Sequence, residues 1–179
     1  MNVVRFAPLA VLLLALLGCP FSSSFPLSDP ASARPDPQLV GHWRTQDPET
    51  SEWNTLTLFS FNDREMVGLA PDGDTGKVDL FRVFATKIGA EDFLNFRELD
   101  SENKDWYFAR YQVADDRLRL KIVDDGLFEN RRFSSSADLR EFIRLHLADP
   151  LLYAADADQP TETVWERVPE PPDTSSSKS

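Results

Sequence analysis

The clearest pattern in the chain is a strict alternation of apolar and basic residues at 117–122. Apolar residues occupy the even positions and basic residues the odd positions, which is typical of a β-strand with one buried and one solvated face. A second β-rich run, 106–113, precedes it across the short polar turn Ala114-Asp115-Asp116. The pattern therefore predicts a β-hairpin over residues 106–122.

Six further runs rich in β-branched and aromatic residues predict strands. They cover 41–45, 56–61, 65–70, 78–88, 93–98 and 163–168. Most of the runs are joined by short polar turns, as at 71–76. Because closure removes the exposed edges of a sheet, we expect a mainly β protein built as an eight-stranded up-and-down antiparallel barrel. An open sheet packed on a helix is the alternative.

One segment with helical periodicity interrupts the strands. Apolar residues from Leu139 to Leu147 recur at spacings of three and four. Ser135 and Ser136 offer hydroxyls for an N-cap, and Pro150 ends the segment. We therefore expect one α-helix before the last strand. Its apolar stripe must lie against the outer wall of the barrel or across an open mouth.

The N-terminus is a short apolar segment that ends at the only cysteine of the chain. Residues 6–17 are almost wholly apolar and follow Arg5. They suit a signal peptide and are too short to span a bilayer, which takes roughly 20 residues. Leu16-Leu17-Gly18-Cys19 resembles a bacterial lipobox. The resemblance implies cleavage before Cys19 and a lipid on its sulfur, because this chemistry needs a strong nucleophile.

This resemblance implies a location as well. The mature protein would be a lipoprotein of the cell envelope, anchored through acyl chains of the palmitate type, several of which give stable attachment. Pro20 stands where an aspartate is associated with retention in the inner membrane, so the outer membrane facing the periplasm is favoured. An ordinary secretory leader followed by an unmodified cysteine is the alternative.

Composition divides the rest of the chain into one domain between two polar ends. After the signal peptide at 1–18, residues 19–38 are rich in serine and proline, and residues 170–179 are similar. We expect a flexible tether and a disordered tail there, with one domain at 39–169. Without residues 1–18 the formal charge changes from −11 to −12. A chain this acidic is repelled by the phosphate backbone, which argues against a nucleic-acid partner.

Two short motifs lie at the ends of the predicted barrel. Gly41-His42-Trp43 is in the first strand and Trp165-Glu166-Arg167 in the last. They resemble the lipocalin-like proteins (calycins), whose first strand carries Gly-x-Trp and in which an arginine from near the chain's end packs on that tryptophan. The resemblance implies that Trp43 and Arg167 close one end of a divergent lipocalin-like barrel by cation–π stacking.

Strand arginines and aromatic residues supply candidate ligand contacts. If their faces point inward, Arg82 and Arg110 line the lumen and can bind a carboxylate or phosphate group. The alternative, that these faces point outward, is favoured because a buried unpaired charge is costly. Trp53, Trp106 and Tyr153 are the candidate rim residues.

Residue patterns for catalysis and metal binding are missing from the sequence. His42 and His146 are the only histidines and have no ligand spacing, so we expect no metal, and no cofactor other than the lipid on Cys19. Asp74-Thr75-Gly76 resembles an aspartic-protease triplet but lies in a polar turn and has no second copy. No nucleophile elbow, phosphate loop or dinucleotide fingerprint occurs. We expect a protein that is not an enzyme.

Two functions stay open at this point. The first is a lipid-anchored protein that binds a small hydrophobic or amphipathic ligand in the barrel. The second is a barrel filled by its own side chains, among them 13 phenylalanines, which acts on a protein partner in the envelope. The volume of the lumen separates the two, since ligand sites are open cavities.

Overall fold

The computed structural model describes residues 20–33, 35–48, 50–72, 75–129, 131–153 and 162–169. The predictions for the signal peptide, Cys19 and the C-terminal tail lie outside these residues. The strands are β1 (Ser22–Ser23), β2 (Gly41–Gln46), β3 (Trp53–Ser60), β4 (Met66–Pro71), β5 (Val78–Ile88), β6 (Glu91–Glu98), β7 (Trp106–Ala114), β8 (Arg117–Ile122) and β9 (Thr163–Val168). The helices are α2 (Ser136–Leu145) and three 3₁₀ turns, Pro30–Ser32, Asp125–Leu127 and Pro150–Leu152.

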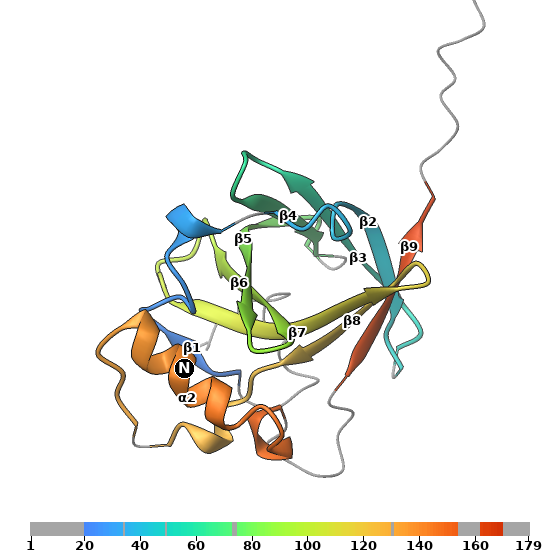
Figure 1. The fold of residues 1–179 in the computed structure, drawn as a ribbon. Helices are drawn as coiled ribbons and strands as arrows, with labels where there is room; N and C mark the ends of the chain where they lie inside the picture. The colour runs from blue at the N-terminus through green and yellow to red at the C-terminus, as the bar shows by residue number, and fades with distance from the viewer. Residues whose placement is uncertain are drawn as a thin grey trace, which may run out of the picture.

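Strands β2 to β9 close into an antiparallel barrel (Figure 1). Each pairs with its neighbour in sequence, and β9 returns to pair with β2. In the described part of the chain this gives eight barrel strands, which confirms the predicted fold and excludes the open sheet. Closure pairs the strand edges that an open sheet would expose.

The alternating segment at 117–122 is β8, and its three apolar residues point into the barrel. The turn between β7 and β8 places Asp115 and Asp116 at φ values of 51° and 56°. Two successive positive φ values are typical of the tight turns that match the twist of a hairpin. Period-two patterning and the polar turn therefore predicted this hairpin correctly.

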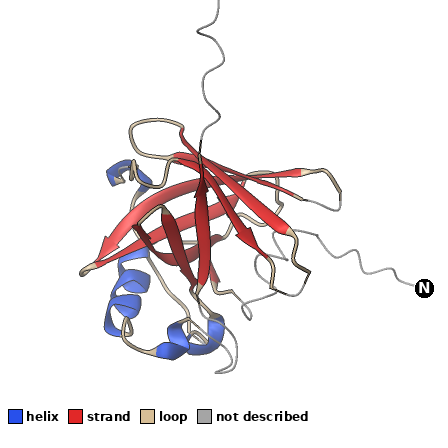
Figure 2. Ribbon diagram, turned by 90° about the vertical axis from the view of Figure 1, so that its right-hand side faces the viewer, coloured by secondary structure: helices blue, strands red, loops and turns tan. Residues whose placement is uncertain are grey.

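Helix α2 lies outside the barrel, beside β5 to β7 (Figure 2). The side chain of Ser135 caps it by accepting a hydrogen bond from the backbone N–H of Asp138. Its buried residues are Leu139, Phe142 and Ile143, which contact the outward-facing apolar residues of the barrel wall. The helix thus lies on the outer wall, the first of the two expected positions.

Residues 20–33 pack on the same outer wall. β1 pairs with the first residues of β7. Leu27 is fully buried, and its backbone N–H donates to the Asn95 side chain at 2.7 Å. The ring of Phe21 stacks on Phe128 with centroids 3.7 Å apart.

This packing corrects the prediction of a flexible tether over residues 19–38. The serine and proline content predicted a chain without fixed packing, because composition takes no account of where the few apolar residues of the segment lie. Phe21, Leu27 and Ala33 are spaced six apart and all reach one apolar cluster. Burying them offsets the conformational entropy lost on ordering the segment.

The wall formed by β5, β6 and β7 separates two hydrophobic cores. We call the cluster inside the barrel the inner core: Leu39, Trp43, Leu58, Met66, Val83, Leu94, Ala109, Tyr111, Leu118, Leu120, Ile122 and Trp165. We call the cluster beneath α2 and residues 20–33 the outer core: Leu27, Ala33, Phe84, Ile88, Phe93, Trp106, Phe108, Val123, Phe128, Leu139, Phe142, Ile143, Leu152 and Tyr153. The wall is therefore buried on both faces.

Candidate ligand cavity

One end of the barrel is sealed around Trp43. The guanidinium carbon of Arg167 lies 4.2 Å from the centroid of the fully buried Trp43 ring. Arg167 Nη1 donates to the carbonyl of Val40 at 2.8 Å, and Trp43 Nε1 donates to that of Leu39 at 2.8 Å. The structure thus brings together the two residues expected to close the barrel.

Gly41 allows this close approach. Its φ is +140°, and a Cβ atom there would lie 2.5 Å from Arg167 Nη1. Any larger residue would displace the guanidinium or strain the backbone. The glycine and the tryptophan of the first-strand motif therefore serve one contact.

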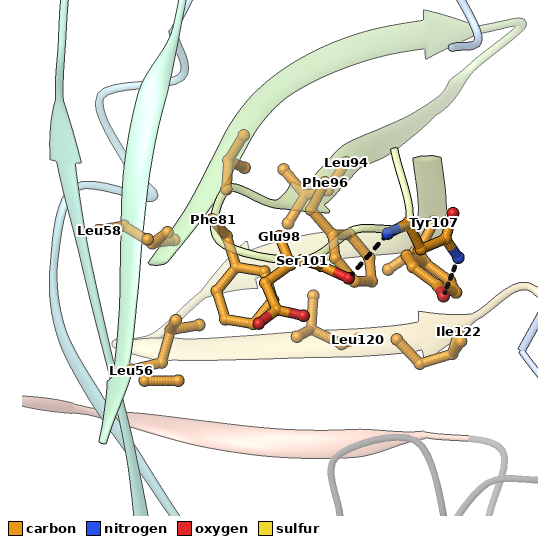
Figure 3. A pocket seen from close by; sticks show the side chains of 15 residues that line it. Leu56, Leu58, Phe81, Leu94, Phe96, Glu98, Ser101, Tyr107, Leu120 and Ile122 are labelled. Atoms are coloured by element: carbon orange, nitrogen blue, oxygen red, sulfur yellow. Dashed lines mark hydrogen bonds between the residues drawn. The ribbon is translucent and has the colours of Figure 1, made fainter. Parts of the chain in front are cut away.

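The other end of the barrel contains an apolar cavity of about 120 Å³ (Figure 3). Neighbouring strands alternate in direction, so the connection from β6 to β7 lies at the end opposite the start of β2. The apolar lining residues come from β3 to β8: Leu56, Leu58, Gly68, Ala70, Phe81, Val83, Leu94, Phe96, Ala109, Leu120 and Ile122. This cavity is the candidate functional site.

The cavity exists because small residues face the lumen on β4 and β7. Gly68, Ala70 and Ala109 all line it. At Gly68 an added Cβ would lie 3.3 Å from the Leu58 side chain and 3.5 Å from those of Phe81 and Val83, so a larger residue there would press on its neighbours.

Polar residues from the end of β6, the following connection and the start of β7 form the rim. Glu98, Ser101, Asn103 and Tyr107 line the cavity there (Figure 3). Asn103 donates from its backbone N–H to Ser101 Oγ at 3.1 Å and from its side chain to the Tyr107 hydroxyl at 3.4 Å. Burial, and then the charge of Asp105, raise the pKa of Tyr107. The phenol is therefore neutral at physiological pH.

The strand arginines do not line this cavity. Lumen-facing residues alternate along a strand, and the cavity takes Phe81 and Val83 from β5, so Arg82 points outward. It pairs there with Glu65. Arg110, next to the cavity-lining Ala109, also points outward, and its Nε lies 2.7 Å from Glu91 Oε2.

The three aromatic rim candidates do not line the cavity either. Trp106 is in the outer core, with the guanidinium of Arg97 4.7 Å from its ring centroid. Tyr153 is buried in the same core. Trp53 is 51% exposed at the start of β3, beneath Arg44. We therefore move the candidate site from these five residues to the cavity.

Sequence reasoning missed the residues that form the site. A usable signal was present in the run 65–70, where Gly68 and Ala70 occupy alternate positions of a strand. Small residues two apart on one face leave space on that face. The rim residues lie in and on either side of a polar connection that sequence alone could not place over a lumen.

A second depression, of about 480 Å³, lies along β7 and β8 and is polar. Its cations are already paired: Arg110 with Glu91 and Arg119 with Glu162, each at 2.7 Å, and Lys121 with the same Glu162 at 3.9 Å. An arginine held by a carboxylate is a poor receptor for a second anion. This depression therefore ranks behind the apolar cavity.

Within the described ranges, no group of three or more histidine, cysteine or acidic side chains is placed to hold a metal ion. His42 Nδ1 lies 2.9 Å from the Thr57 hydroxyl on the outside of the barrel. His146 Nδ1 lies 2.8 Å from the carbonyl of Phe142. Among the same residues, no helix has the length and hydropathy needed to cross a membrane.

Comparison with known proteins yields no relative: the chain matches no family model, no curated protein and no solved structure at a significant level.

Proposed function

We propose that this protein is a lipid-anchored, lipocalin-like protein of the bacterial cell envelope that binds a small hydrophobic or amphipathic ligand. It has no enzymatic role in this proposal. The ligand occupies the apolar cavity beside Leu94, Phe96 and Leu120, with any polar group at the rim. The observation that carries the proposal is an apolar cavity at one end of a barrel whose other end is sealed by Trp43 and Arg167.

The size of the cavity limits what it can hold. A dry engineered cavity of about 150 Å³ in another protein binds benzene. The volume of about 120 Å³ here suits one aromatic ring or the last few carbons of an alkyl chain. It is well below the roughly 300–1,000 Å³ of sites that enclose drug-sized molecules. The ligand is therefore small, or only its end enters the barrel.

The anchor is supported by the lipobox-like sequence that ends at Cys19. The described chain begins at Pro20, which already pairs with Asp124 on the domain. A lipid on Cys19 would hold the domain close to the bilayer, with no free spacer between them. Substituting Cys19→Ser should remove the acyl mass and release the protein from the membrane fraction.

Native mass spectrometry of the full-length protein, purified from its own membranes, tests ligand binding. We expect an added mass that leaves on denaturation, whereas the acyl mass stays bound. Ala109→Leu fills the cavity and should abolish the releasable mass. Ala137→Leu, on the exposed face of α2, is the matched control and should retain it. Equal ligand occupancy in both variants would contradict the proposal.

An envelope protein partner is the second candidate function. Phe59 and Phe61 are 40% and 70% exposed at the end of β3, away from the side that α2 covers. Exposed aromatic residues are enriched in protein interfaces. A photocrosslinker in place of Phe61 should then capture one reproducible protein in cells, whereas one in place of the exposed Leu145 should not.

A further inference from the structure

The lumen side of the cavity rim carries more carboxylates than cations. Glu98 lines the cavity, and Asp79, two residues before the cavity-lining Phe81, faces the same side and is 5% exposed. Lys77 lies between them, with its Nζ 2.9 Å from Asp79 Oδ1 and 3.7 Å from Glu98 Oε1. One ammonium group therefore serves two carboxylates.

The connection between β6 and β7 increases this imbalance. It contains three acidic residues, Asp100, Glu102 and Asp105, and one lysine, Lys104. The ammonium of Lys104 donates a hydrogen bond to the backbone carbonyl of Ser101 at 2.7 Å. It is the one cation in this connection, against three carboxylates. Asp100 adds to the negative field at Lys77, and Asp105 to that at Tyr107.

The arginines that could have countered these charges face away. Arg82 and Arg110 sit on the outer side of the wall, each in an ion pair with a glutamate. Of the described residues that line the cavity, none is basic and Glu98 is the only charged one. A guanidinium clamp for a carboxylate head group, which the strand arginines suggested, is therefore not formed at this site.

We propose that the cavity selects amphiphiles whose head group is cationic over carboxylates of the same chain length. This inference rests on the proposed ligand-binding function. The alkyl part enters between Leu94, Phe96 and Leu120, and the head group stays at the rim beside Glu98. An ammonium group there gains an ionic hydrogen bond. A carboxylate meets like charges and loses part of its hydration.

Three probes of equal chain length separate the effect of charge from that of apolar contact: hexylammonium, 1-hexanol and hexanoate. Binding is measured by NMR titration of the full protein anchored in zwitterionic lipid nanodiscs, with empty nanodiscs as the blank. We expect hexylammonium to bind about fivefold more tightly than hexanoate, the ratio that one partly exposed ion pair gives. Hexanol should fall between them.

The variant Glu98→Gln keeps the shape of the side chain and removes its charge. It should bring the hexylammonium-to-hexanoate ratio close to one while leaving hexanol binding unchanged, which also shows that the variant is folded. Glu141→Gln, on the exposed side of α2 and paired with Arg144 at 2.7 Å, is the control and should keep the full ratio.

Other outcomes overturn different parts of this account. If hexanol binds but hexanoate binds as tightly as hexylammonium, the selection by charge is wrong and the ligand cavity stands. If selection persists in Glu98→Gln, Glu98 is not its source. If none of the three probes binds, the proposed function fails and this inference fails with it.

Discussion

The two hydrophobic cores share one wall but are filled differently. The outer core contains five of the 13 phenylalanines, and two more, Phe21 and Phe133, pack against it; several of these rings contact one another, as Phe128 does with Phe21 and Phe142. The inner core contains no phenylalanine; Phe81 and Phe96 pack against it and line the cavity. Most of the phenylalanines that pack in a core therefore lie outside the barrel.

This difference shows how the barrel combines stability with an open lumen. A wall buried on both faces gains apolar contacts from the outer core whether or not the lumen is full. The two largest fully buried side chains of the lumen, Trp43 and Trp165, fill its sealed end. Small residues at the other end leave a space that a ligand could use.

The largest effect should come from emptying the outer core. Phe108 is fully buried there and contacts Phe21. Phe108→Ala should lower the free energy of unfolding by about 3–5 kcal/mol, because it removes a large side chain from a filled region. Urea denaturation measures the change. A loss below about 1 kcal/mol would mean that the outer core is as loosely filled as the lumen.

A smaller loss is expected at the sealed end. Arg167→Ala removes the stacking on Trp43 and the hydrogen bond to the Val40 carbonyl. We expect about 1–3 kcal/mol of destabilisation in thermal or urea unfolding. Arg167→Lys should recover only part of it, because an ammonium cannot match the planar guanidinium. If Arg167→Lys restored the full wild-type stability, stacking of the Arg167 guanidinium on Trp43 would not be what stabilises this end of the barrel.

Adding the same side chain to each core sharpens the comparison. Ala33 is buried in the outer core, and Ala109 lines the cavity. Ala33→Leu should cost about 1–3 kcal/mol, because overfilling a packed region forces strain. Ala109→Leu should cost less than about 1 kcal/mol, because space is present. Equal costs in equilibrium unfolding would argue that the cavity is closed in solution.

The smallest effect concerns the pH dependence of stability at Asp124. This carboxyl is 1% exposed, and Oδ2 has no hydrogen-bond partner among the described residues. Burial raises its pKa. Since the folded pKa lies above the unfolded value of about 3.9, the wild-type protein loses stability as the pH rises from that value through the folded pKa.

Asp124→Asn keeps the acceptor that receives the N–H of Gly126 and removes the titration. The variant should match the wild type near pH 3 and be the more stable protein at pH 7.5. Urea unfolding at both pH values checks this. A difference that is the same at both values would show that ionisation of Asp124 is not involved.

The sequence allowed the fold to be predicted more fully than the site. Eight strands and the helix followed from period-two and helical patterns, because β8 and α2 each bury one face. The wall strands bury both faces, so alternation alone could not say whether Arg82 or Phe81 faced the lumen. The sequence did not predict that residues 20–33 pack on the domain, because this packing depends on long-range contacts such as the hydrogen bond between Leu27 and Asn95.

The central claim is that the lumen has room for a ligand and the outer core does not. A methyl NMR titration of the full protein with 1-hexanol tests it directly. We predict shifts for the methyl groups of Leu94, Leu120 and Ile122, which line the cavity, and none for Ile88 and Ile143 in the outer core. Shifts confined to the outer core, or no shifts at saturating hexanol, would contradict the account.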